Sequence, residues 1–134
     1  MLQHKFVDYM PDDILSGILY ISMIYGTAIH KCCCGCGEEV VTPFSPTDWK
    51  ITFDGDNVSL SPSIGNWSFK CQSHYFIRNG HVDWCQSWTN KQVSDNRKED
   101  SFNKQLHFQQ RKKQEVTERS AFVTWMFKLF KIKT

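Results

Sequence analysis

Four of the six cysteines of this 134-residue chain fall within five residues, in the run from His30 to Gly37 that reads HKCCCGCG. Neighbouring cysteines lie too close together, and point too differently, to form an unstrained disulfide with one another. Thiolates at alternate positions can turn toward one ion, while the glycines let the backbone fold tightly around it. A tetrahedral site needs four ligands, so Cys71, Cys85 or His74 would complete the set. The run therefore predicts a bound zinc ion.

A second segment, with the sequence SLSPSIGN, could supply a nucleophile. Ser63 follows a proline at the end of an expected strand, where a turn can present its hydroxyl group outward. The backbone amides of Gly65 and Asn66 would point toward the same space, and a hydroxyl beside free amide donors is what acyl transfer requires. A plain turn uses the same residue types for backbone reasons, so both interpretations stay open.

His74 lies in the run CQSHY and has three possible roles. It could ligate the metal, accept a proton from Ser63, or satisfy a hydrogen bond in the core. Cys85 could be a metal ligand, a core thiol, or a thiol nucleophile opposite His74. Asp56 and Asp83 could orient a histidine, but nothing in the sequence selects either.

The elements that must position these residues are mostly short strands. Residues 17–25 and 49–53 are rich in β-branched and aromatic residues, and residues 58–60 return after a turn. The alternation of Trp67, Phe69 and Cys71 indicates a further strand. The clearest hairpin is 74–84, where Asn79-Gly80 favours a tight turn and leaves His81 at the surface. We therefore expect an α+β, mostly β fold: a small antiparallel sheet or barrel stapled by zinc, followed by a C-terminal helix.

The charge of the chain is divided unevenly. Residues 97–134 hold ten Lys or Arg against four acids, so this tail carries +6 and residues 1–96 carry −4 of the net +2. The tail turns helical from about Ser101, and its last segment is apolar nearly all round. We expect a zinc-stabilised β domain at 1–90, then a polar linker and a basic amphipathic helix at 91–134. No signal peptide or membrane span is visible, which favours a reducing, cytoplasmic setting and metal over disulfides.

The motifs in combination resemble a known family. HxCxCGCG, LxPSIGNW from Leu60 to Trp67, and CxSHY from Cys71 to Tyr75 are similar to a bacterial zinc-binding family long labelled a domain of unknown function. Its members occur in operons for ubiquitin-like protein conjugation, in antiphage defence, and the domain is thought to be a serine peptidase. The resemblance covers roughly residues 11–85.

The resemblance implies roles for particular residues. The two polar residues typical of the family correspond to Ser63 and His74. The metal-binding positions of the family correspond to Cys32, Cys34, Cys36 and Cys71. Cys33 and Cys85 depart from the pattern, which puts the choice of ligands in question but not the presence of a site.

Two hypotheses from different classes follow. In the first, the chain is a serine peptidase with structural zinc, in which Ser63 attacks, His74 acts as base, and the Gly65 and Asn66 amides hold the oxyanion. Its partners would be a ubiquitin-like protein or its conjugates, and other conjugation enzymes, rather than nucleic acid. In the second, it is a non-enzymatic zinc-ribbon-like adaptor that binds a protein or nucleic acid. His74 discriminates between them, because a zinc-bound histidine cannot serve as a base.

Overall fold

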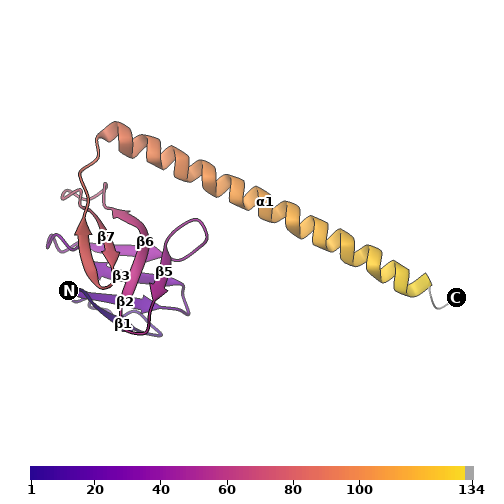
Figure 1. Cartoon of the computed structure of the whole chain (residues 1–134), viewed down its shortest axis with the longest axis horizontal. Helices are drawn as coiled ribbons and strands as arrows, with labels where there is room; N and C mark the ends of the chain where they lie inside the picture. Colours follow the sequence, from indigo (N-terminus) through magenta and orange to yellow (C-terminus); the bar gives the residue numbers. More distant parts are fainter. Residues whose placement is uncertain (132–134) are drawn as a thin grey trace. The chain divides into compact units, whose positions relative to one another are not determined.

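The computed structural model describes residues 1–131, which form eight strands in two four-stranded sheets and one long helix (Figure 1). The first sheet has the order β1-β2-β3-β4. Its strands are β1 (Gln3–Phe6), β2 (Ile18–Ser22), β3 (Thr27–Lys31) and β4 (Glu39–Pro43). β1 runs parallel to β2, and the other pairings are antiparallel.

The second sheet has the order β5-β6-β7-β8 and is antiparallel throughout. Its strands are β5 (Lys50–Phe53), β6 (Val58–Gly65), β7 (His74–Arg78) and β8 (His81–Trp84). One apolar cluster joins the two sheets, because Leu19 and Ile21 of the first pack with Leu60, Ile64 and Tyr75 of the second. The expected mostly β fold with a C-terminal helix is confirmed, as two open sheets rather than a closed barrel.

The hairpin of β7 and β8 forms as the sequence predicts. Asn79 and Gly80 both have positive φ, 48° and 72°, as a tight two-residue turn requires. Arg78 pairs with His81, and counting outward brings His74 opposite Cys85, whose N–H donates to the His74 carbonyl at 2.9 Å. The turn thereby fixes where His74 lies along the sheet.

Other expected boundaries are wrong. Trp67, Phe69 and Cys71 lie in a turn rather than a strand, where the Phe69 N–H donates to the Asn66 carbonyl at 3.1 Å. β6 continues to Gly65 instead of ending at Leu60. The alternation of apolar and polar residues at 67–71 wrongly indicated a strand, because successive tight turns can also expose alternate residues.

The helix α1 (Asn90–Lys131) begins well before the expected Ser101. Thr89 and Gln92 start it as a reciprocal cap: the Thr89 N–H donates to Gln92 Oε1 at 2.8 Å, and the Gln92 N–H donates to Thr89 Oγ1 at 3.3 Å. None of the described residues of α1 is buried. The chain divides into two compact units after Val93. In the part that the structure describes, no helix combines the length and apolar character needed to cross a bilayer.

Candidate active site and cysteine cluster

A bulge in β6 presents Ser63. Leu60 pairs with Ile77 and Ile64 pairs with Tyr75, so three residues of β6 lie opposite a single residue of β7 between these pairs. These three residues, Ser61-Pro62-Ser63, form a bulge with two surplus residues, and such bulges bend a strand and are common near active sites. Beyond the bulge Gly65 pairs with His74. Ser63 lies two positions before Gly65, so strand alternation turns its side chain to the face that carries His74.

The two side chains meet. His74 Nε2 lies 2.9 Å from Ser63 Oγ, and His74 Nδ1 lies 3.1 Å from the carbonyl oxygen of Gln86. A carbonyl only accepts hydrogen bonds, so Nδ1 carries the ring proton in neutral His74. Nε2 is then the acceptor for the Ser63 hydroxyl. This is the tautomer that a general base beside a hydroxyl nucleophile needs.

The partner that orients His74 is therefore a main-chain group. Asp83 and Asp56 do not take this part, since Asp83 pairs with Arg78 at 3.4 Å and Asp56 accepts from Asn57 Nδ2 at 3.4 Å. No side chain in the sequence could have revealed the Gln86 carbonyl. The available signal was the hairpin register, which brings the residues after Cys85 alongside His74.

Two indoles pack around His74. The rings of Trp67 and Trp88 stack on each other with centroids 5.3 Å apart, and each contacts the imidazole edge-on, at 5.0 and 4.9 Å. Only 7% of the His74 surface is exposed, so its position is fixed on several sides. Gly65 makes room for Trp67, because a Cβ atom at that position would overlap the indole, nearest to its Nε1.

The two expected oxyanion donors differ in availability. The Asn66 N–H donates to the Ser73 carbonyl at 2.8 Å, so it does not fit the expected role. The alternation of an antiparallel ladder then turns the Gly65 N–H away from β7. β5 pairs with β6 only as far as Ser61, so no strand of the sheet lies beside that edge of Gly65 in residues 1–131.

The cysteines Cys32, Cys34, Cys36 and Cys71, which we call the cysteine cluster, lie together. Their sulfur atoms are all within 4.8 Å of one another, and three of the pairs, Cys32–Cys34, Cys36–Cys71 and Cys32–Cys71, are 3.4, 3.8 and 3.9 Å apart. A tetrahedral zinc ion with Zn–S bonds of about 2.3 Å separates its sulfurs by about 3.8 Å. The turn that carries the cluster bends at Gly35 and Gly37, with φ of 87° and 85°. The four thiols could therefore hold a metal ion.

The surroundings of the cluster shift the pKa values of Cys34 and Cys71 in opposite directions. Desolvation raises the pKa of Cys34 to about 12. At Cys71 desolvation acts the same way, but hydrogen bonds from the Ser73 side chain and backbone outweigh it and lower the pKa to about 7. A metal ion bound by these cysteines would favour their thiolate forms.

Polar contacts connect the cysteine cluster to the strands of the Ser63–His74 pair. Cys32 Sγ lies 3.0 Å from Ser73 Oγ, and Asn66 Nδ2 donates to Ser73 Oγ at 2.9 Å while lying 3.8 Å from Cys32 Sγ. Ser73 precedes His74, and Asn66 follows Gly65. The sequence indicated a role only for the backbone amide of Asn66 and none for Ser73, since the contacts of these two buried side chains join distant turns.

The remaining candidate ligands lie outside the cluster. His74 is directed at Ser63, Cys33 packs against the core, and Cys85 Sγ lies 4.0 Å from the Asp83 carbonyl. His30, which begins the cysteine run, is fully buried with Nε2 2.8 Å from the Tyr75 hydroxyl. Burial lowers the pKa of His30 to about 4, so it is neutral at pH 7.

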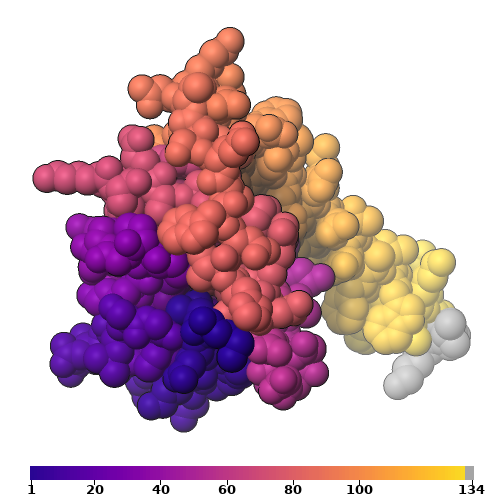
Figure 2. All heavy atoms as spheres, turned by 60° about the vertical axis from the view of Figure 1, so that its left-hand side comes forward, coloured from indigo at the N-terminus to yellow at the C-terminus, as the bar shows by residue number. Residues whose placement is uncertain are grey.

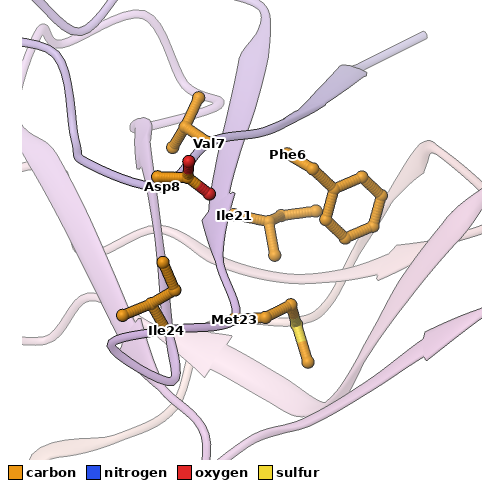
Figure 3. A pocket seen from close by; sticks show the side chains of 6 residues that line it. All are labelled: Phe6, Val7, Asp8, Ile21, Met23 and Ile24. Carbon is orange, nitrogen blue, oxygen red and sulfur yellow. The ribbon is translucent and has the colours of Figure 1, made fainter.

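A shallow pocket elsewhere contributes nothing to this arrangement. It has a volume of about 150 Å³ and is lined by side chains of β1, β2 and the residues that follow them, among them Phe6, Asp8 and Ile24 (Figure 3). The lining holds one carboxylate, Asp8, and otherwise apolar side chains, with no serine, cysteine or histidine. The paired candidates for nucleophile and base, Ser63 and His74, lie instead on β6 and β7.

Comparison with curated proteins and with solved structures finds no match for the chain. One family model does match, over residues 6–85, which is more than half of the sequence and includes Ser63, His74 and the whole cysteine cluster. This confirms the resemblance drawn from the motifs. The chain belongs to the family of bacterial ubiquitination-like system serine proteases, BubE.

Proposed function

We propose that this chain is a serine peptidase in which Ser63 is the nucleophile and His74 the general base. The observation that carries the proposal is the position of His74 between the Ser63 hydroxyl and the Gln86 carbonyl, at 2.9 and 3.1 Å. This arrangement combines a nucleophile, a base within hydrogen-bond reach of it, and a group that orients the base. The family to which the chain belongs adds support.

The proposed reaction follows from these contacts. Ser63 Oγ attacks the substrate carbonyl while its proton passes to His74 Nε2, and the imidazolium then protonates the leaving amine. The Nδ1–H bond to Gln86 stabilises the imidazolium. A water molecule, deprotonated in turn by His74, hydrolyses the acyl-enzyme and restores the Ser63 hydroxyl. The Gly65 N–H is the oxyanion donor we propose, since the Asn66 N–H is engaged with Ser73.

The substrate we propose is the C-terminal tail of a ubiquitin-like protein, as a precursor or in a conjugate. The family name gives the biological setting. The open edge of β6 beyond Ser61 suits an extended chain, which could add as a strand beside Gly65 and bring its carbonyl groups to the bulge. Cleavage at a flexible C-terminal tail fits such binding, because a folded segment could not pair with this edge.

We propose zinc as the metal of the cysteine cluster, with a structural role. The cluster is all sulfur, with spacings near those of a tetrahedral thiolate site, and four thiolates leave no open position for water. The ion would be held by the four cysteines of the cluster, Cys32, Cys34, Cys36 and Cys71. Through Ser73 and Asn66 it would also hold in place the turns next to Gly65 and His74.

The test is cleavage of a ubiquitin-like fusion by matched variants. Ser63→Ala and His74→Ala should each abolish cleavage by a similar factor, because residues that act as one unit fail together. Ser61→Ala, an exposed serine in the same bulge, is the control and should retain activity. A fluorophosphonate probe should label the unmodified chain and not Ser63→Ala.

Zinc content and melting temperature separate the two hypotheses. Both should stay nearly unchanged in Ser63→Ala and His74→Ala if these residues act in catalysis. If His74→Ala loses zinc and unfolds, His74 is a metal ligand and the adaptor hypothesis replaces the peptidase.

A further inference from the structure

The last three turns of α1 expose an unusual amount of apolar surface. Seven large apolar side chains between residues 122 and 130 are each 39% to 73% exposed, and they are Phe122, Val123, Trp125, Met126, Phe127, Leu129 and Phe130. No residue of α1 is buried within the described part of the helix. Figure 2 shows bulky side chains forming the surface of this yellow end of the helix. We call residues 121–131 the apolar end of α1.

The polar side chains of this segment share one narrow sector. An α-helix turns by about 100° per residue, which places Thr124, Lys128 and Lys131 within about 60° of one another around the axis. The seven large apolar side chains span about 200° of the remaining arc. A coiled-coil seam or a helix-binding groove needs only one stripe of apolar residues and favours polar residues elsewhere.

A wide apolar arc rich in Phe and Trp, with lysines on the opposite sector, is the pattern of a helix lying in a membrane interface. Such a helix buries its apolar face at the boundary between lipid headgroups and acyl chains, while lysine side chains extend toward the headgroups. The charge agrees with an anionic surface, since residues 97–134 carry +6. The segment is also too short and too charged to span a bilayer, in agreement with the absence of a spanning helix among the described residues.

We propose that the apolar end of α1 binds the surface of a membrane that contains anionic lipids. The helix lies in the plane of the interface, with Phe127 and Phe130 among the side chains that enter the lipid and Lys128 at the headgroups. This is a binding function separate from peptide hydrolysis. It needs neither Ser63 nor His74.

The experiment is co-sedimentation of the full chain with vesicles of equal parts phosphatidylglycerol and phosphatidylcholine. The unmodified chain should bind these vesicles, and binding should weaken with added salt and on vesicles of phosphatidylcholine alone. The double variant Phe127→Ser/Phe130→Ser should bind at least about tenfold more weakly, because two large apolar groups no longer enter the lipid. Lys128→Glu should weaken binding only to the anionic vesicles.

The same helix offers a matched control. Phe102 and Phe108 are exposed to a similar degree, 58% and 56%, but lie upstream of the apolar end. Phe102→Ser/Phe108→Ser should bind within about twofold of the unmodified chain, with circular dichroism showing that helix content is kept. A folded chain that does not bind anionic vesicles would overturn the proposal, as would an equal loss in the control. So would self-association that Phe127→Ser/Phe130→Ser abolishes without vesicle binding, since a second copy would then cover the segment.

Discussion

Replacement of Gly65 by alanine is a direct test of how the Ser63–His74 pair is supported. The φ angle of Gly65 is not in the left-handed region, so an alanine can adopt the same backbone conformation. The added Cβ would nevertheless lie 2.7 and 3.0 Å from Cε2 and Cζ2 of Trp67, with Nε1 nearer still. Neighbouring carbon atoms are normally about 3.5–4.0 Å apart, so the indole must move.

The size of the effect follows from this overlap. Forcing one extra carbon into a packed site usually costs about 1–3 kcal/mol of unfolding free energy. Relief requires the indole to move by several tenths of an ångström or more, and that indole contacts His74 with centroids 5.0 Å apart. Displacement of a catalytic group by about 1 Å can cost about 10²-fold in rate. We therefore expect a larger loss of activity than of stability.

The assay measures chemical denaturation and cleavage of a ubiquitin-like fusion for Gly65→Ala, Trp67→Ala and the double variant. Trp67→Ala removes the atoms that the new Cβ meets, so adding Gly65→Ala to it should cost almost nothing in stability. The coupling energy should be about 1–3 kcal/mol. If Gly65→Ala alone is as stable and active as the unmodified chain, Trp67 does not support His74 as described.

Further predictions concern the metal and the helix. Elemental analysis should find about one zinc ion per chain, and a chelator should lower the melting temperature sharply, because structural zinc binding is part of the folding free energy. Cys34→Ser should lose zinc, whereas Cys85→Ser should keep it. Ser73→Ala, which leaves Asn66 Nδ2 without its 2.9 Å partner, should weaken zinc binding about 10- to 100-fold and reduce activity at unchanged fold. A chain truncated after Thr89 should fold and bind zinc; failure to fold would show that the apolar end of α1 is part of a core.

Much of the fold could be predicted from local patterns. Asn79-Gly80 predicted the hairpin, because this pair favours a tight turn with positive φ at both residues. The register depended on whether the loop has two or three residues, and the structure has two. The β-branched and aromatic residues of 49–53 predicted β5. The start of α1 was missed although Thr89 and Gln92 spell a capping box, since the polar residues that follow concealed a helix whose apolar stripe begins much later.

The site was harder to predict because its geometry depends on groups that leave no local pattern. The sequence marked Ser63 and His74 as candidates, but their separation depends on a bulge that changes the pairing of β6 with β7. The contacts of Trp67 and Trp88 with His74 join a turn to the segment after β8. The loss of the Asn66 amide as a donor depends on which residues of a ladder are paired. These contacts depend on how the strands and turns pair with one another, and residue types alone do not specify that pairing.

The Gln86 carbonyl has a consequence for how this protein can vary. A base oriented by a carboxylate is lost when a single codon changes that acid, but every amino acid brings a carbonyl to position 86. Gln86→Ala should therefore leave hydrolysis nearly intact. Insertion of a residue between Cys85 and Gln86 would instead place a different peptide group under His74 Nδ1, whatever its side chain. At position 86 the spacing from Cys85, rather than the identity of the side chain, is what drift in the sequence must preserve.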